Sequence, residues 1–316
     1  MRIVFMGTPD FAVQTLKTLV DNNYNVVGVI TMPDKPAGRG QQIQQSAVKQ
    51  FAVAHNLHIL QPTNLKDETF LHELKSLQAD LQIVVAFRML PERVWNMPPL
   101  GTYNLHASLL PQYRGAAPIN WAIINGEKET GITTFKLQHK IDTGNILMQQ
   151  KVTITPDMNA GELHDILMTQ GADLVLQTVK KIEQGNITLT EQNKLLVGNE
   201  AKHAPKIFKD TCRINWNDNI NNIYNLIRGL SPYPCAWTEL NMSDKKIIFK
   251  IYQTTKTEVQ QGLQYGHIKT DNKTFLQVAV PGGFIEVTEL QMAGKKKLST
   301  SEFLKGFSFT ENSFFA

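Results

Sequence analysis

Three residues of this chain, Asn104, His106 and Asp142, have side chains suited to acyl-transfer chemistry. A carboxamide can donate a hydrogen bond to a developing oxyanion. An imidazole can carry a proton near neutral pH, and a nearby carboxylate can orient that imidazole and favour its charged form. The sequence shows no obvious nucleophile beside them, which favours direct transfer of an acyl group over a covalent enzyme intermediate.

Each of these residues also has a plainer interpretation. His106 is a candidate for a hydrogen-bonded core histidine, and Asn104 for the cap of a loop. Asp142 precedes Thr143 and Gly144, a combination that is typical of a turn. Spacing alone does not bring Asp142 to His106, so the shared site remains a hypothesis at this point.

The N-terminal part of the chain alternates short apolar runs with stretches of helical spacing. Predicted strands lie at residues 3–6, 26–30, 58–60, 81–87 and 101–106. This alternation predicts an α/β fold with a parallel sheet covered on both faces. Ligands of such sheets bind at the carboxyl ends of the strands. Asn104 and His106, two residues apart at the end of the fifth strand, therefore point to the same side.

The C-terminal part has a different pattern. Residues 184–205 show little periodicity and are interpreted as a linker. After them come a helix near residues 220–227 and short strands with glycine-rich turns, which predict a small barrel of the oligonucleotide-binding (OB) type. We therefore divide the chain into residues 1–204, which include the linker, and residues 205–316.

Charge and cysteine content limit the choice of partners and compartment. Residues 1–204 contain 18 Lys and Arg and 18 Asp and Glu, whereas residues 205–316 contain 14 and 10, so the net charge of +4 lies in the second part. That excess indicates a polyanionic partner, with an ordinary scatter of surface charges as the alternative.

Two cysteines, Cys212 and Cys235, suit a reducing cytoplasm. No apolar run reaches membrane-spanning length, and we expect a cytoplasmic monomer.

A long connection follows the second predicted strand, at residues 31–42, and carries Lys35 and Arg39. Loops of this length inside an α/β unit are often functional, and a surface insertion is the alternative.

After the first strand, Gly7-Thr8-Pro9-Asp10 supplies only one glycine of a dinucleotide-binding fingerprint, which makes a nicotinamide cofactor a weak interpretation. We find no metal-binding motif and expect no metal.

Several longer motifs together resemble those of the formyltransferases that use 10-formyltetrahydrofolate, over nearly the entire chain. The motifs are Asn104-Leu105-His106-Ala107-Ser108-Leu109-Leu110-Pro111, Tyr113-Arg114-Gly115-Ala116-Ala117-Pro118, Glu129-Thr130-Gly131 and Asp142-Thr143-Gly144. The branch of this family that acts on tRNA is suggested by Met6-Gly7-Thr8-Pro9-Asp10-Phe11, Pro33-Asp34-Lys35-Pro36-Ala37-Gly38-Arg39-Gly40, Ala204-Pro205-Lys206-Ile207 and Ile227-Arg228-Gly229-Leu230-Ser231-Pro232.

This resemblance implies a Rossmann-like formyltransferase domain followed by an OB-like domain that binds tRNA. It implies 10-formyltetrahydrofolate as the formyl donor and the amine of methionyl initiator tRNA as the acceptor. The implied roles are catalysis for Asn104, His106 and Asp142, folate contact for Ser108, Leu109, Leu110 and Pro111, and tRNA contact for Arg39 and Lys206. Ala107 and Arg88 stand where many members have glycine, and Arg88 bears on the shape of the pterin pocket.

Two other functions remain open. One is formyl transfer to a small amine, such as an amino sugar nucleotide or glycinamide ribonucleotide. The other is a non-catalytic nucleic-acid-binding module built on the C-terminal barrel. Lys209 and the run Lys295-Lys296-Lys297 are further candidates for phosphate contacts, with a solvated loop as the alternative for the run.

Overall fold

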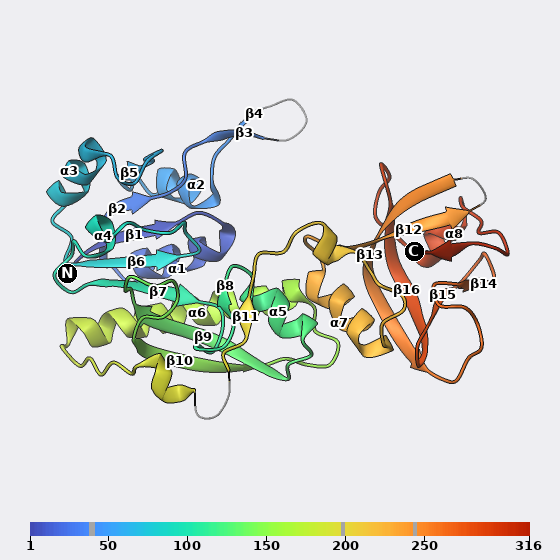
Figure 1. The fold of residues 1–316 in the computed structure, drawn as a ribbon. Coiled ribbons are helices and arrows are strands. Elements are labelled where there is room, and N and C mark those ends of the chain that lie inside the picture. Colours follow the sequence, from blue (N-terminus) through green and yellow to red (C-terminus); the bar gives the residue numbers. More distant parts are fainter. Residues whose placement is uncertain (38–41, 197–199, 243–244) are drawn as a thin grey trace. The chain divides into compact units, whose positions relative to one another are not determined.

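The computed structural model describes residues 1–37, 42–196, 200–242 and 245–316 (Figure 1). They form two compact units. The first, which we call the α/β unit, consists of Met1–Gly115, Thr130–Val152 and His164–His203. The second, the barrel unit, consists of Ala116–Glu129, Thr153–Leu163 and Ala204–Ala316.

The α/β unit is built on a sheet with the strand order β10-β9-β7-β6-β1-β2-β5. Its strands are β1 (Arg2–Gly7), β2 (Asn25–Ile30), β5 (Ile59–Leu60), β6 (Leu81–Val85), β7 (Thr102–His106), β9 (Glu129–Lys136) and β10 (Ile146–Thr153). Strand β1 lies between β2 and β6 and is parallel to both, while β5 and β7 extend the parallel part. The predicted Rossmann-like parallel sheet is thus confirmed, with β9 added antiparallel to β7.

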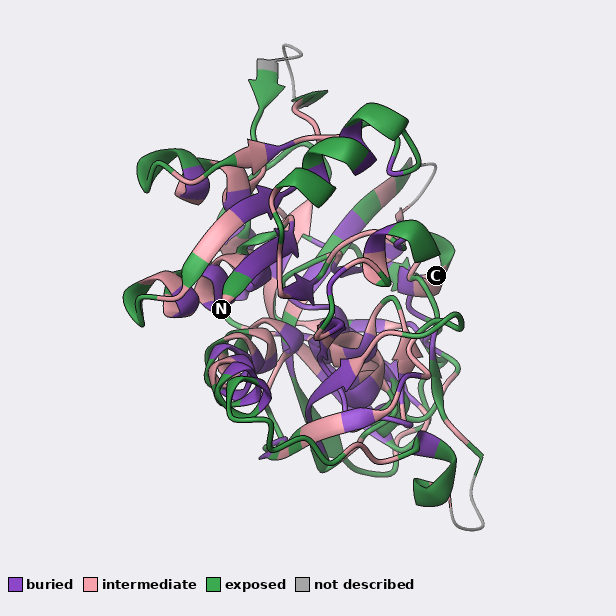
Figure 2. Ribbon diagram, turned by 90° about the vertical axis from the view of Figure 1, so that its left-hand side faces the viewer, coloured by how far each residue is buried: buried purple, intermediate pink, exposed green. Residues whose placement is uncertain are grey.

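Helices flank this sheet and follow from local sequence signals. They are α1 (Asp10–Asp21), α2 (Ala47–Ala54), α3 (Glu68–Ser76), α4 (Glu92–Trp95) and the long α6 (Ala160–Glu183). The side chains of Ser46 and Asp67 accept hydrogen bonds from the first turns of α2 and α3 and so fix where these helices begin. Figure 2 shows buried residues gathered on the strands and exposed residues along the outer faces of helices.

Two segments that the sequence leaves irregular contain strands or helical turns in their described parts. The connection at residues 31–42 contains an antiparallel hairpin of β3 (Lys35–Ala37) and β4 (Gln42–Gln44), and Arg39 lies outside the described residues. The segment interpreted as a linker contains a 3-10 helix, η1 (Gln192–Leu195), and β11 (His203–Ala204), which pairs with β8 (Arg114–Gly115). Gln192 is only 2% exposed, so this segment is packed against the α/β unit.

The barrel unit contains a sheet in the order β14-β15-β16-β13-β12-β18, with β17 paired to β16. Its strands are β12 (Ala236–Met242), β13 (Lys245–Glu258), β14 (Ile268–Thr270), β15 (Leu276–Val280), β16 (Gly283–Met292), β17 (Leu298–Ser299) and β18 (Phe314–Phe315). A bridge between His267 and Phe314 joins the two ends of the sheet, so the predicted barrel is nearly closed.

Three helices belong to the barrel unit: α5 (Pro118–Ile124), α7 (Ile220–Leu230) and α8 (Thr300–Leu304), with a 3-10 turn, η2, at Asp210–Cys212. Helix α7 buries Ile220, Ile223, Ile227 and Leu230 in the barrel core. These positions recur at helical spacing and form one apolar stripe.

Helix α7 also holds the two earlier segments of the barrel unit. Asn120 of α5 donates its side-chain N–H to the carbonyl oxygen of Gly229 at 2.8 Å. The hydroxyl of Tyr224 donates to Oδ1 of Asp157 at 2.7 Å, and Arg228 donates to the carbonyl oxygen of Met158 at 2.8 Å. Residues 116–129 and 153–163 therefore pack with the C-terminal region, which the sequence did not indicate.

Within the described ranges, no helix combines the length and apolar character needed to cross a bilayer.

We expect Tyr224→Phe to destabilise the barrel unit, by about 1–2 kcal/mol, because Asp157 loses its hydrogen-bond donor. Burial, then the bond to Asp157, raises the pKa of Tyr224 from 10.0 to about 12. Because the pKa is higher in the folded state than in the unfolded state, the protonated Tyr224 hydroxyl stabilises the folded protein fully below pH 10. That contribution to the free energy of unfolding disappears as the pH rises towards about 12. Urea unfolding at several pH values should show the difference between wild type and variant shrinking over this range.

The matched control is Tyr265→Phe, because Tyr265 is 45% exposed and its hydroxyl makes no hydrogen bond within the described part of the chain. This control should leave the free energy of unfolding unchanged. Equal effects of the two substitutions would contradict the role given to the Tyr224 hydroxyl.

Candidate active site

His106 is the last residue of β7 and is only 7% exposed. Its Nε2 lies 2.9 Å from the carbonyl oxygen of Tyr113. A carbonyl oxygen only accepts, so Nε2 carries the hydrogen. Among the residues that the structure describes, Nδ1 has no hydrogen-bond partner, and it is the ring nitrogen left for a substrate.

Asn104 lies two residues before His106 on β7 and is half-buried. Its backbone pairs with Val84 of β6 and Phe135 of β9, so the strand is held from both sides. In the described ranges its carboxamide makes no hydrogen bond to another side chain or to the main chain. The amide is therefore available to a ligand on the side of the sheet that His106 also faces.

Asp142 lies in the connection between β9 and β10, and its Oδ2 accepts a hydrogen bond from the backbone N–H of Gly115 at 3.0 Å. Its φ of +53° places it in the left-handed region, which aspartate tolerates better than most residues. Gly144 lies so close to β9 that a Cβ there would be 1.8 Å from the carbonyl oxygen of Lys136. The backbone of this connection thus suits Asp142 and leaves no room for a side chain at Gly144.

Gln192 joins the segment around Arg114 to the connection that carries Asp142. Arg114 donates from Nε and Nη2 to Oε1 of Gln192, at 2.9 and 2.6 Å. The Nε2 of Gln192 donates to the carbonyl oxygens of Asp142 and Gly144, both at 2.8 Å. Burial lowers the pKa of Arg114, and the charge of Asp142 opposes that shift. The sequence gives no sign of Gln192, because it stands in a stretch without periodicity.

The structure brings the predicted catalytic residues together indirectly. His106 and Asp142 both bond to the segment Tyr113–Gly115, one through its first carbonyl and the other through its last N–H. The sequence-based hypothesis has Asp142 orient His106 directly. In the described part of the chain no hydrogen bond joins these two side chains, and the three-residue segment connects them instead.

The predicted folate segment, Ser108 to Pro111, follows β7 and is mostly buried. Ser108 is fully buried and donates its hydroxyl to the carbonyl oxygen of Gln112 at 2.6 Å. Leu110 is 1% exposed and packs in an apolar cluster with Phe135. Because Ser108 and Leu110 face inward, the half-buried Leu109 is the side chain of this segment that is best placed to meet a ligand.

Two polar residues that the sequence did not single out hold this segment, Gln149 on β10 and the fully buried Thr133. The hydroxyl of Thr133 donates to the carbonyl oxygen of Ser108 at 2.6 Å and accepts from the N–H of Leu110 at 3.1 Å. Gln149 donates to the carbonyl oxygen of Leu110 at 2.8 Å and to the hydroxyl of Thr133 at 2.9 Å.

Leu109 is accommodated by a glycine of the neighbouring strand. A Cβ at Gly131 would lie 2.5 Å from a methyl carbon of Leu109 and 2.2 Å from the carbonyl oxygen of Gln150. The glycine of the motif Glu129-Thr130-Gly131 therefore makes room for Leu109.

Arg88 lies just after β6 and forms hydrogen bonds with backbone carbonyl oxygens rather than an ion pair with a carboxylate. Its guanidinium donates to the carbonyl oxygens of Pro62 and Thr63, the latter at 3.0 Å, and burial lowers its pKa. Arg88 thereby ties the segment after β6 to the segment after β5. Both segments follow the carboxyl ends of parallel strands, where ligands of such sheets bind.

The barrel unit has a cation-rich surface that contains aromatic rings. Lys206 is exposed, and its ammonium lies 5.6 Å from the ring centre of Phe208, which is 63% exposed. Lys209 and Arg213 each lie 5.5 Å from the ring centre of Trp237, whose indole N–H donates to the carbonyl oxygen of Lys209. We call these five residues the Lys206–Trp237 patch. Cations interleaved with aromatic rings are typical of nucleic-acid-binding surfaces.

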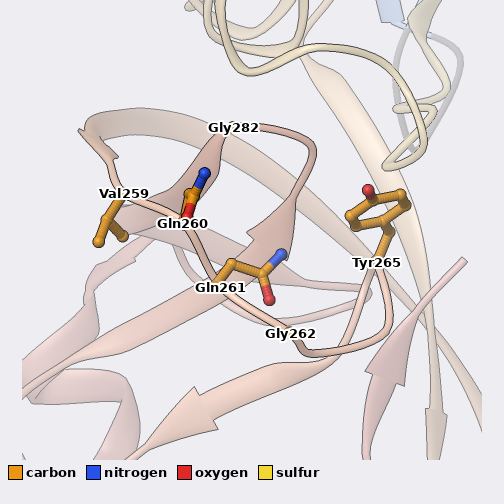
Figure 3. Close-up of a pocket in the computed structure, with 6 residues that line it drawn as sticks. All are labelled: Val259, Gln260, Gln261, Gly262, Tyr265 and Gly282. Carbon is orange, nitrogen blue, oxygen red and sulfur yellow. The ribbon is translucent and has the colours of Figure 1, made fainter.

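The barrel unit also has an open cavity of about 640 Å³ beside the connection between β13 and β14. Figure 3 shows Tyr265 across this cavity from the glutamines and Gly262 of the connection. All of its lining residues belong to the barrel unit, whereas Asn104, His106 and Asp142 belong to the α/β unit. In the described ranges, no group of His, Cys, Asp and Glu side chains has an arrangement that could hold a metal ion.

Comparison with known proteins identifies the family. The family model described as formyl transferase matches residues 1–179, and the model of the formyl transferase C-terminal domain matches residues 206–308. The chain belongs to the formyl transferase family. It is 58% identical to the methionyl-tRNA formyltransferase of Bacteroides fragilis, over 98% of this chain and 96% of that protein. It is 53% identical to the protein of that name from Flavobacterium johnsoniae, over 98% of both.

Two solved structures that contain bound folates share the fold. One is the N-formyltransferase from Helicobacter canadensis in complex with folinic acid and dTDP-3-aminofucose, with a TM-score of 0.67 and 20% identity over 94% of this chain and 99% of that one. Another is HypX from Aquifex aeolicus in complex with tetrahydrofolic acid, with a TM-score of 0.65 and 18% identity over 98% of this chain and 48% of that one. At this level of identity, the similarity shows the fold alone.

We expect Thr133→Val to reduce the free energy of unfolding by about 1–3 kcal/mol. The substitution keeps the shape but leaves the buried N–H of Leu110 and the carbonyl oxygen of Ser108 without the hydroxyl. Chemical denaturation monitored by tryptophan fluorescence measures the change. Thr169→Val on the exposed face of α6 is the control, and a loss of the same size there would contradict this role of Thr133.

Proposed function

We propose that this protein transfers the formyl group of 10-formyltetrahydrofolate to the α-amine of methionyl initiator tRNA. The observation that carries the proposal is the identity of 53–59% to proteins named methionyl-tRNA formyltransferase, over nearly the full length of both chains. The folate-type donor is supported by the folate-bound members of the same fold. Formylated initiator tRNA serves translation initiation, which places the reaction in the cytoplasm.

In the proposed reaction the neutral α-amine attacks the formyl carbon and a tetrahedral oxyanion forms. Asn104 donates an N–H of its free carboxamide to that oxyanion. His106 takes the proton of the attacking amine on Nδ1, since Nε2 is already bound to Tyr113. The bond between the formyl carbon and the folate nitrogen then breaks, and that nitrogen receives the proton from His106.

Asp142 acts in this proposal through the backbone. Its carboxylate holds the N–H of Gly115 and thereby fixes the segment whose first carbonyl orients His106. The three side chains lie in the α/β unit of a single chain, which supports a monomer as the proposed acting form. The segment Ser108 to Pro111, with the half-buried side chain of Leu109, is the proposed folate contact.

For the acceptor, Lys206 of the Lys206–Trp237 patch and Arg39 are the proposed tRNA contacts. The patch supplies cations for phosphates and the exposed ring of Phe208 for stacking. Formyl transfer to an amino sugar nucleotide is the second candidate, because a protein of the same fold was solved with dTDP-3-aminofucose.

One assay decides between these acceptors. The protein is mixed with 10-formyltetrahydrofolate and either methionyl initiator tRNA or a dTDP-linked amino sugar, and formylated product is measured by mass spectrometry. We expect formyl-methionyl-tRNA and no formylated sugar. The reverse result would refute the tRNA acceptor while leaving the formyltransferase chemistry intact.

Asn104→Ala and His106→Ala should each lower the single-turnover rate at least about 100-fold, because each removes a group that acts in the transition state. Tetrahydrofolate binding, measured by calorimetry, should be largely retained. His58→Ala, which removes an exposed histidine paired with Glu73, is the control and should keep the wild-type rate. Near-normal rates in Asn104→Ala or His106→Ala would remove that residue from the mechanism.

Lys206→Gln should weaken tRNA binding uniformly and reduce the slope of log K against log salt by about one, as expected for the loss of one phosphate contact. Filter binding over a range of salt concentrations measures the slope. Lys17→Gln, on an α1 lysine already paired with Asp21, should leave the slope unchanged. An unchanged slope in Lys206→Gln would exclude that lysine from the tRNA interface.

A further inference from the structure

The β3–β4 hairpin cannot by itself fix its orientation relative to the rest of the α/β unit. In the described part of the chain its strands make three residue pairs, from Lys35 with Gln44 to Ala37 with Gln42. A hairpin this short is not stable by itself in water. Figure 1 shows it standing clear of the sheet, and Ile43 is 72% exposed. Its direction must therefore be set by what holds its base.

Asp34 precedes the hairpin and is bound from two other elements. Its Oδ2 accepts from the ammonium of Lys49, in α2, at 2.5 Å. Its Oδ1 accepts from Nε2 of Gln61, the residue after β5, at 2.8 Å. The same Gln61 nitrogen donates to the carbonyl oxygen of Met32 at 2.9 Å, so the chain entering the hairpin is held at two points.

A second contact closes the base of the hairpin. The hydroxyls of Thr31 and Ser46, which lie on either side of the hairpin in the sequence, are 2.7 Å apart. Thr31 is fully buried, and the Ser46 hydroxyl also accepts from the N–H of Lys49. The chain that enters the hairpin is thereby joined to the chain that leaves it.

The Asp34–Lys49 pair differs from an ordinary surface ion pair. The side chains of Asp34 and Lys49 are 24% and 16% exposed, whereas those of Lys17 and Asp21, neighbours on one face of α1, are 51% and 50% exposed. An exposed pair within one helix contributes little to stability. The Asp34 pair instead connects a loop to a helix, and the hydrogen bonds from Lys49 and Gln61 hold the pKa of its carboxyl below the usual value.

The sheet topology places this base at the edge where the chemistry takes place. Strands β2 and β7 run in the same direction, because β2, β1, β6 and β7 are successively parallel. The segment that leads into the hairpin therefore follows the carboxyl end of β2, as His106 ends β7. Segments at this common edge of a parallel sheet meet the ligand.

We propose that Asp34, Lys49 and Gln61 are positioning residues that fix the direction of the β3–β4 hairpin so that it meets the acceptor tRNA. The described part of the hairpin offers the cation of Lys35 and the exposed apolar side chain of Ile43 for that contact. The proposal rests on the proposed function for its substrate, whereas the anchoring of the hairpin is independent of it.

The first experiment measures the hairpin's direction in the full-length protein without substrate. Spin labels are placed at Ile43→Cys on β4 and His72→Cys on the exposed face of α3, both in the α/β unit. Cys212 and Cys235 are 3% and 2% exposed, so they do not react with the label in the folded protein. We expect a narrow distance distribution by electron–electron double resonance, and a clearly broader one in Asp34→Asn, Lys49→Met and the double variant.

The second experiment measures kinetics without labels. Asp34→Asn and Lys49→Met should each raise KM for methionyl-tRNA about tenfold, because displacing a substrate-positioning group by a fraction of an ångström is costly. KM for 10-formyltetrahydrofolate should remain at the wild-type value. The double variant should be no worse than either single one, since both substitutions remove the same ion pair. Asp21→Asn, which breaks the Lys17–Asp21 pair, is the matched control and should behave as wild type.

Three outcomes are decisive. Distance distributions as narrow in the variants as in wild type would overturn the anchor. Broader distributions with an unchanged KM for methionyl-tRNA would overturn its role towards the acceptor. If the wild-type protein formylates a different amine, the proposed function fails, and broadening in the variants still supports the anchor.

Discussion

The site depends on the way in which the short segment Tyr113–Gly115 is held. Its first carbonyl receives the N–H of His106, its last N–H binds Asp142, and Arg114 between them bonds to the buried Gln192. These hydrogen bonds favour one arrangement, because breaking any of them leaves a partly buried polar group unsatisfied. The imidazole therefore has a fixed ring orientation before any substrate binds. A catalytic group held in this way needs no reorganisation as charge develops.

Part of this arrangement follows from local sequence. The apolar run that ends at His106 predicts a strand, and a spacing of two places Asn104 and His106 on one side of it. The turn signal at Asp142 to Gly144 is correct, because Gly144 has no room for a Cβ and Asp142 has a positive φ. These features depend on residues that are close together in the sequence, so a local sequence pattern can predict them.

The rest depends on partners far apart in the sequence. Gln192 binds the carbonyl oxygen of Asp142 across 50 residues, and it stands in a stretch that local patterns assign to a linker. Thr133 supports Ser108 and Leu110 from the neighbouring strand, and a threonine in a strand carries no sign of such a task. The hairpin at residues 35–44 was missed for a related reason, since its strands are short and its base is held by Lys49 and Gln61.

The two units do not follow the two family models along the chain. The model of the N-terminal part covers residues 1–179, yet residues 116–129 and 153–163 pack with the barrel unit. They do so through α7, where Asn120 binds the carbonyl oxygen of Gly229 and Asp157 binds Tyr224. Segment 116–129 begins directly after Gly115, the residue that binds Asp142. The chain therefore passes from the site segment directly into a segment that packs within the barrel unit.

The central claim is that the carbonyl of Tyr113 fixes the His106 ring with its hydrogen on Nε2 and leaves Nδ1 to the substrate. Nitrogen-15 NMR of protein labelled at histidine reports this directly, with His106→Gln used to assign the signal. In the substrate-free protein we expect Nε2 to carry a proton and to show a coupling across the hydrogen bond to the Tyr113 carbonyl carbon. A signal showing a bare Nε2, with the proton on Nδ1 alone, would contradict the account.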